Sequence, residues 1–196
     1  CLVAAGLLAK KILQHHPVSA SISIQARLIE AGGNSNIDAA IEQAMAANDS
    51  IGGIVECSVQ GMPVGLGEPF FDSIESRLSH AVFSIPAIKG IEFGSGFAAA
   101  RLSGSAHNDP IINAEGKTAT NHAGGINGGI SNGNPLLFRV AVKPTSSTPK
   151  EQQTWHAATN QPESVSYKGR HDLCIALRVP VVIEAVTALV LADFIL

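Results

Sequence analysis

Apolar and polar positions recur with two different periods along the chain, and these periods predict most of its elements. Residues 3–14 and 38–47 carry apolar side chains three or four positions apart, which predicts two helices, with Ile41 and Met45 on the apolar face of the second. Ser19–Glu30 and Leu136–Lys143 alternate with period two, which predicts half-buried strands, and 50–60 is a further expected strand. A third helix is expected after Asp72–Glu75, whose sequence resembles a capping box.

The later part of the chain is less regular. Residues 84–97 are expected to be extended, whereas 103–135 and 144–171 are expected to be loops. The apolar residues 173–179 and 181–195 predict a strand and a closing helix, and two acidic side chains within 179–196 favour a buried helix over a membrane span. This order predicts an α+β fold, with helices packed on largely antiparallel β-sheets and no internal domain boundary over residues 1–196.

Composition and charge exclude several classes of protein. The 196 residues are 45% hydrophobic and 15% charged with a formal net charge of −3, so disorder is excluded. No overall basic field is available for nucleic acid or an anionic membrane. The three cysteines follow no disulfide or zinc spacing, which predicts buried free thiols in a reducing cytosol, and the histidine and carboxylate spacing predicts no metal site.

Three polar segments are candidates for chemistry. The glycine pairs 124–125 and 128–129 can turn backbone N–H groups toward an anion, or can serve as turns between strands. Lys143–Ser147 follows a strand and can hold a phosphate, or can be an ordinary polar exit from that strand. In residues 168–172, Arg170 can grip a phosphate or carboxylate and Asp172 can accept a proton, or the two can pair in a solvated turn.

Taken together, these segments resemble the C-terminal half of chorismate synthase. Several long motifs occur in the order that the family has. They are DSIGGIVEC at 49–57, GMPVGLGEP at 61–69, FDSIE at 71–75, LSHAVFSIPAIKG at 78–90, GS at 104–105, ND at 108–109, TNHAGG at 120–125, GGISNG at 128–133, KPTSS at 143–147 and GRHD at 169–172.

The resemblance implies a reaction in the shikimate pathway of aromatic amino acid biosynthesis. The substrate, 5-enolpyruvylshikimate 3-phosphate, loses phosphate and a ring proton by 1,4 anti elimination to give chorismate, with reduced FMN (FMNH2) as cofactor. The resemblance also implies a cytoplasmic homotetramer, an association with NADP, and no nucleic acid or membrane partner.

The family's site residues can be placed on matching positions of this sequence. Asp172 matches a carboxylate near the flavin ring and is the expected catalytic residue, and Arg170 matches an arginine near both flavin and substrate. Pro86 stands where the family commonly has Asn, so only a backbone contact is expected to remain there. The expected flavin contacts are Pro86, Ala87, Gly128, Lys143, Pro144, Thr145, Ser146, Ser147 and Arg170.

Two motifs of the family have no counterpart in this sequence. They are an opening Gly-Glu-Ser-His-Gly and a later Ser-Ala-Arg-Glu-Thr, and Cys1–Leu13 matches the Ala-rich helix that follows them. The chain is therefore expected to be a C-terminal portion that is inactive alone. The alternatives are a truncated, non-catalytic module for oligomerisation or anion binding, and a flavin protein of different chemistry.

Overall fold

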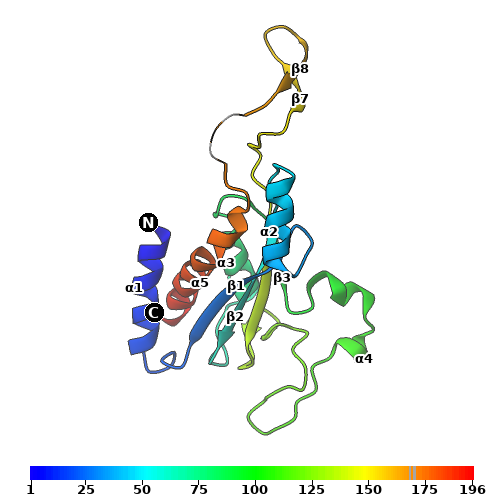
Figure 1. Cartoon of the computed structure of the whole chain (residues 1–196). Coiled ribbons are helices and arrows are strands. Elements are labelled where there is room, and N and C mark those ends of the chain that lie inside the picture. Colours follow the sequence, from blue (N-terminus) through cyan, green and yellow to red (C-terminus); the bar gives the residue numbers. More distant parts are fainter. Residues whose placement is uncertain (168, 170) are drawn as a thin grey trace.

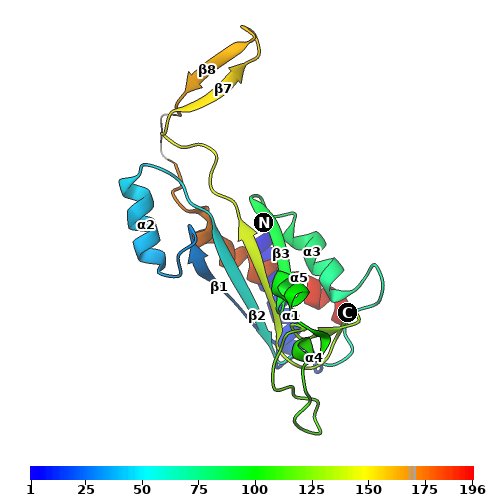
Figure 2. The same ribbon diagram turned by 90° about the vertical axis from the view of Figure 1, so that its right-hand side faces the viewer.

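Figure 1 shows the computed structural model of the chain, which describes residues 1–167, 169 and 171–196. One four-stranded antiparallel sheet forms its centre, with the strand order β1-β2-β6-β3. Helices α1, α3 and α5 lie on one face of this sheet (Figures 1 and 2). The elements of this body are α1 (Leu2–His15), β1 (Ser23–Ala31), α2 (Ile37–Ala46), β2 (Gly53–Gln60), α3 (Ile74–Val82), β3 (Ile88–Phe93), β6 (Leu136–Val142) and α5 (Val179–Ile195).

The core lies between the sheet and these helices. Every second side chain of β2 and β6 points into it, because side chains alternate between the two faces of a strand. The buried residues of these two strands are Val55, Cys57, Val59, Leu136, Phe138, Val140 and Val142. The period-two pattern that predicted β6 is confirmed, and so is the predicted mixture of helices with antiparallel sheet.

The closing helix is the most deeply packed helix of the fold. Residues Ile175–Ile195 are long and apolar enough to cross a membrane, but 56% of the most apolar stretch is buried inside the protein, against α1, α3 and the sheet. Its one central carboxylate, Glu184, accepts hydrogen bonds from Lys10 Nζ (2.7 Å) and from the backbone N–H of Ala26 (2.9 Å). The prediction of a buried helix is therefore confirmed.

Two details of the predicted helices are wrong. The N-cap of α3 is Ser73, whose hydroxyl accepts the Ser76 N–H at 3.1 Å, so the expected box that began at Asp72 is displaced by one residue. In α2 the buried positions are Ala40 and Ala44, whereas Met45, expected on the apolar face, is exposed. Small side chains let α2 lie close to β1, and they carry little hydrophobic signal.

The predicted strand at 173–179 is a 3-10 helix, η2 (Ile175–Arg178), that leads directly into α5. A short apolar run fits a buried strand and a buried helix equally well, so its period does not decide between them. Pro180 lies in the first turn of α5, where a helix leaves N–H groups unpaired and proline costs nothing.

The long polar segments also contain structure that the sequence did not predict. The glycine-rich region includes η1 (Gly96–Arg101), α4 (Gly104–His107) and a short hairpin of β4 (Ile126–Asn127) with β5 (Ile130–Ser131). Within 144–171, β7 (Gln152–His156) pairs with β8 (Gln161–Val165) as a hairpin that projects away from the body (Figures 1 and 2). Nearly all of its side chains are exposed, so no alternation marks these strands.

The opposite face of the sheet carries a row of alternating charges. Its members are adjacent in the strand register, one from each strand, and are Arg27, Glu56, Arg139 and Glu92. Glu56 pairs with Arg27 Nη2 at 3.1 Å and with Arg139 Nε at 3.0 Å, and Arg139 Nη1 lies 3.4 Å from Glu92. These ion pairs connect all four strands on the face opposite α1, α3 and α5.

Candidate functional site

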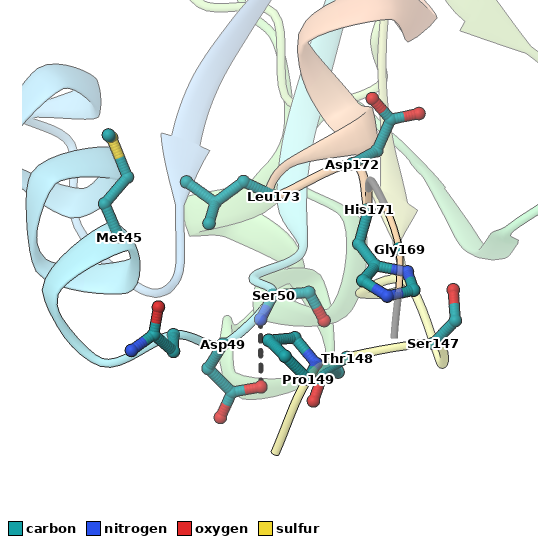
Figure 3. Close-up of a pocket in the computed structure, with 11 residues that line it drawn as sticks. Met45, Asp49, Ser50, Ser147, Thr148, Pro149, Gly169, His171, Asp172 and Leu173 are labelled. Atoms are coloured by element: carbon teal, nitrogen blue, oxygen red, sulfur yellow. Dashed lines mark hydrogen bonds between the residues drawn. The ribbon is translucent and has the colours of Figure 1, made fainter. Parts of the chain in front are cut away.

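Two loops that are distant in sequence meet at one end of the sheet. One follows β6 and the other precedes η2, and together with the end of α2 they line a cavity of about 260 Å³ (Figure 3). The lining residues are Met45, Asn48, Asp49, Ser50, Ser147, Thr148, Pro149, Gly169, His171, Asp172 and Leu173. Ser147 and Asp172, both predicted site residues, thus border the same cavity.

The loop after β6 is fixed to the body near its start. The Lys143 N–H donates to the carbonyl of Ala87 at 2.9 Å, so two of the predicted flavin segments lie in contact. Ala87 itself has φ +72°, a conformation that few non-glycine residues adopt. Two residues after Lys143, the carbonyl of Thr145 accepts a hydrogen bond from Ser50 Oγ at 2.6 Å.

Two groups on this loop are available to a ligand. The buried hydroxyl of Thr145 has no hydrogen-bond partner among the described residues, and buried polar atoms are normally paired. The Lys143 ammonium makes only a 3.4 Å contact with the carbonyl of Pro144. It forms no ion pair among the described residues. A cation and an unpaired hydroxyl are donors suited to a phosphate or to the polar edge of a ring.

Asp49 is one of the residues that line the cavity. One carboxylate oxygen accepts from Lys150 Nζ at 2.9 Å and the other from the Ser50 N–H at 2.9 Å, the contact dashed in Figure 3. The hydrogen bond from Lys150, followed by that from Ser50, lowers the pKa of Asp49 below its ordinary value of 3.8. The group is therefore ionised at neutral pH and neutralises Lys150.

The second loop contributes His171 and Asp172. In Figure 3 the His171 ring points toward Ser147, and its Nε2 lies 3.0 Å from the carbonyl of Tyr167. Asp172 pairs with Arg178 Nη2 at 2.7 Å, so its carboxylate already has a cationic neighbour. Arg170, the predicted phosphate and flavin ligand, lies outside the described residues.

Gly128 does not lie with the other predicted flavin residues. It occupies the β4–β5 turn beside the start of α3, where the Ile74 N–H donates to the next glycine's carbonyl. That turn is near the first residue of β6, whereas Lys143 follows the last. The seven residues of β6 are joined by six steps of about 3.3 Å, so its two ends lie about 20 Å apart. Pro86 is exposed beside Ala87.

A carboxylate organises the loop that precedes this turn. Asp109 accepts from Thr120 Oγ1 (2.7 Å) and from the N–H groups of His122 (2.7 Å) and Ala123 (2.9 Å). Burial alone would raise the pKa of Asp109, but the bonds from Ala123, Thr120 and His122 outweigh it and lower the pKa below 3.8. His122 Nδ1 in turn lies 2.8 Å from Ser95 Oγ.

Asp49 and Ser50 were missed as site residues, although the motif that contains them was recognised. In the sequence they stand out only as polar residues at the junction of a predicted helix that ends at residue 47 and a predicted strand that begins at residue 50. Across the described ranges no three His, Cys, Asp or Glu side chains are grouped to hold a metal ion. The donors on the loop after β6, Lys143 and the Thr145 hydroxyl, suit an anionic, hydrogen-bonding organic ligand.

Comparison with known proteins gives one consistent family. The chorismate synthase family profile matches residues 1–196. The chain is 66% identical to a chorismate synthase of Chitinophaga pinensis, covering 100% of the chain and 57% of that protein, and 46% identical to one of Dehalococcoides mccartyi, covering 96% and 52%. A chorismate synthase crystal structure superposes with a TM-score of 0.78 at 27% identity, covering 98% of the chain and 61% of that structure. The chain thus spans between half and two thirds of the length of these relatives.

Proposed function

The chain belongs to the chorismate synthase family, and from this membership we propose that it carries part of the flavin site of a carbon–oxygen lyase. The proposed reaction converts 5-enolpyruvylshikimate 3-phosphate to chorismate. The observation that carries the proposal is the meeting of residues 147–149 with Gly169 and residues 171–173 at one cavity, since the resemblance places flavin motifs on the two loops that contain them.

Two donors on the loop after β6, just before the residues of that loop that line the cavity, fit FMN. Lys143 and the Thr145 hydroxyl lack the partners that such groups normally have, as judged over the described residues, and both can bind phosphate or ring oxygens. The cavity of about 260 Å³ is below the usual range for a whole drug-sized ligand, so it would hold a portion of the cofactor. Ala87, Pro144, Ser146 and Ser147 would complete the contacts on this side.

Reduced FMN, when bound, supplies electron density to the allylic system of the substrate. The protein's share of the reaction is to bind, orient and move a proton. In the elimination, the bond from carbon to the phosphate oxygen breaks, phosphate leaves with the electron pair, and a ring proton is removed. We assign Asp172 to assist that proton removal, with Arg178 holding its carboxylate in place. Arg170 is assigned to the substrate or flavin anion by the resemblance alone.

Gly128 remains a proposed flavin contact at a different place. About 20 Å of strand lies between it and Lys143 within one chain. A single flavin site could contact both Gly128 and Lys143 only if a second copy of the chain placed its Gly128 near Lys143 of the first. The proposed homotetramer would bring such copies together. A cytoplasmic location and an association with NADP are proposed from the resemblance alone. A non-catalytic module for oligomerisation or anion binding is the alternative.

FMN binding tests the site directly. The protein to test is the full-length one, which is this chain together with any segments that correspond to the parts of the relatives it does not match. In that protein Lys143→Met should weaken FMN binding about tenfold or more, because a charge-assisted hydrogen bond is lost. Flavin fluorescence titration measures the dissociation constant. Lys11→Met, on an exposed position of α1, is the control and should change it less than twofold.

Equal binding by wild type and the Lys143→Met variant would remove this lysine from the flavin site. The 196-residue chain alone is proposed to give no chorismate, since it spans 57% of the length of its relative from Chitinophaga pinensis. Turnover by this chain with reduced FMN would contradict that part of the proposal. Anion binding without any flavin binding would favour the non-catalytic alternative.

A further inference from the structure

Both loops at the cavity are attached to the same three residues of the body. Ser50 Oγ donates to the carbonyl of Thr145 at 2.6 Å, and the Ile51 N–H donates to the carbonyl of Leu173 at 2.9 Å. Asp49 binds Lys150 at the far end of the first loop. Residues 49–51, here called the clasp, therefore connect two segments that are separated by more than twenty residues in sequence.

We propose that Asp49 and Ser50 are positioning residues, which hold the two cavity loops at the separation that flavin binding requires. This inference rests on the proposed function, because it concerns the loops assigned to FMN. Neither side chain is proposed to touch the cofactor. Their effect passes through Thr145 and Lys150, which lie on the loop that follows β6.

The clasp is rigid because it is continuous with the centre of the sheet. The next residues, Gly52 and Gly53, lead into β2, which pairs with a strand on each side. A Cβ atom at Gly52 would meet the carbonyl oxygen of Val142, and one at Gly53 would meet that of Glu30. The chain is thus pressed between β1 and β6, and this fixes where the hydroxyl of Ser50 lies.

The loop depends on these contacts for its own position. Between Lys143 and Lys150 its internal side-chain hydrogen bonds, among the described residues, are a 3.4 Å contact and the bond from Lys150 N–H to Thr148 Oγ1 at 3.1 Å. Neither bond joins the loop to the sheet. The attachments to the body are those at Lys143 N–H, Thr145 and Lys150, and the clasp supplies two of these three.

The charge of Asp49 also distinguishes Lys150 from Lys143. Asp49 neutralises Lys150, while Lys143 has no carboxylate partner within the described ranges. The cation left for an anionic ligand is therefore Lys143. Removing the Asp49 charge would release Lys150 and leave the far end of the loop without its anchor.

Substitution of Ser50 in the full-length protein tests the proposal by two measurements. Ser50→Ala should weaken FMN binding about five- to tenfold in a fluorescence titration, because one part-buried hydrogen bond to the loop is lost. In the flavin-free protein, amides of residues 143–150 should exchange hydrogen faster while those of β2 and β6 are unchanged. Ser50→Thr keeps the hydroxyl and should stay within twofold of wild type in both measurements.

A matched control lies at the other end of the sheet. Ser21 Oγ also donates to a backbone carbonyl across the fold, that of Gly61 at 3.2 Å, so Ser21→Ala removes a similar bond away from the cavity. It should leave FMN affinity and exchange at 143–150 unchanged. Asp49→Asn and Lys150→Met should each weaken FMN binding, and the double variant should be no weaker than the worse single one, because they share one contact.

The outcomes separate this inference from the proposed function. If wild type binds FMN and Ser50→Ala binds it equally with unchanged exchange at 143–150, the inference is overturned and the flavin site stands. Faster exchange spread evenly over β2 and β6 would also overturn it, since Ser50 would then serve general stability. If wild type binds no FMN, the proposed function fails, and the exchange of 143–150 alone decides whether the clasp holds the loop.

Discussion

Asp109 illustrates how a single side chain can organise a long loop without a hydrophobic core. Its two oxygens accept three hydrogen bonds from residues 120–123, where the glycine-rich sequence begins. A carboxylate that receives several N–H and O–H donors is stabilised in its ionised form. The glycine-rich segment is therefore an ordered arrangement that depends on one charge, rather than a flexible connection.

Asp109→Asn should destabilise the protein by about 1–2 kcal/mol at pH 7, because bonds to a charged acceptor are lost. The lowered pKa of Asp109 means that its contribution is fully present above its ordinary value of 3.8 and disappears as the pH falls through the lowered value. Urea unfolding of both proteins between pH 7 and pH 2.5 should show their difference shrinking below about pH 3.8.

Glu42→Gln, which removes an exposed charge from α2, is the control and should show no such pH dependence. A difference between wild type and the Asp109→Asn variant that stays constant from pH 7 to pH 2.5 would contradict the role assigned to this carboxylate.

The hydrogen bonds of Asp49 and Ser50 could not be predicted from the sequence. Asp49 and Ser50 are ordinary polar residues before a strand, and their partners lie 101 and 95 positions away. Ser147 and Asp172 could be placed at the site because longer motifs surround them. The bonds from Asp49 and Ser50 only exist once the fold has brought β2 beside β6.

At the scale of elements, the charged residues in the row opposite α1, α3 and α5 differ in how far they are buried between the middle and the edge of the sheet. The Glu56 side chain is 16% exposed and binds two arginines, whereas the Arg27 side chain at the edge is 77% exposed. Exposed ion pairs contribute little because water screens them, while removing a half-buried partner leaves a charge without compensation.

Glu56→Ala should therefore cost about 2 kcal/mol of unfolding free energy, and Arg27→Ala less than about 0.5 kcal/mol. Urea denaturation of the two variants and wild type measures both values. Equal losses in the two variants would show that the row is a set of independent surface pairs. A larger loss for Arg27→Ala would reverse the assignment of centre and edge.

Elements were predictable from the sequence where one face is buried and the other is not. The strand β6 was recognised because the apolar residues Leu136, Phe138, Val140 and Val142 recur at every second position and share one face. Residues 152–165 were not, because both faces of that hairpin are exposed and its strands carry no alternation. The segment 175–178 was assigned to the wrong element because a short apolar run fits a strand and a helix equally well.

At the scale of the whole molecule, the fold divides the predicted site between two ends of one sheet. The α+β architecture agrees with the sequence prediction. Of the predicted site residues, Ser147 and Asp172 line one cavity. The position of Gly128 does not follow from them, since motif order says nothing about which end of β6 a loop occupies. Chain length also matters at this scale, because the chain spans 57% of a relative that is 66% identical.

We propose that this chain is part of a chorismate synthase that works through reduced flavin. The most direct measurement incubates the full-length protein anaerobically with 5-enolpyruvylshikimate 3-phosphate and reduced FMN, and follows chorismate and released phosphate together. We predict that the two products form in equal amounts and only when reduced FMN is present. The account would be contradicted if no chorismate formed under these conditions, or if it formed equally fast without flavin.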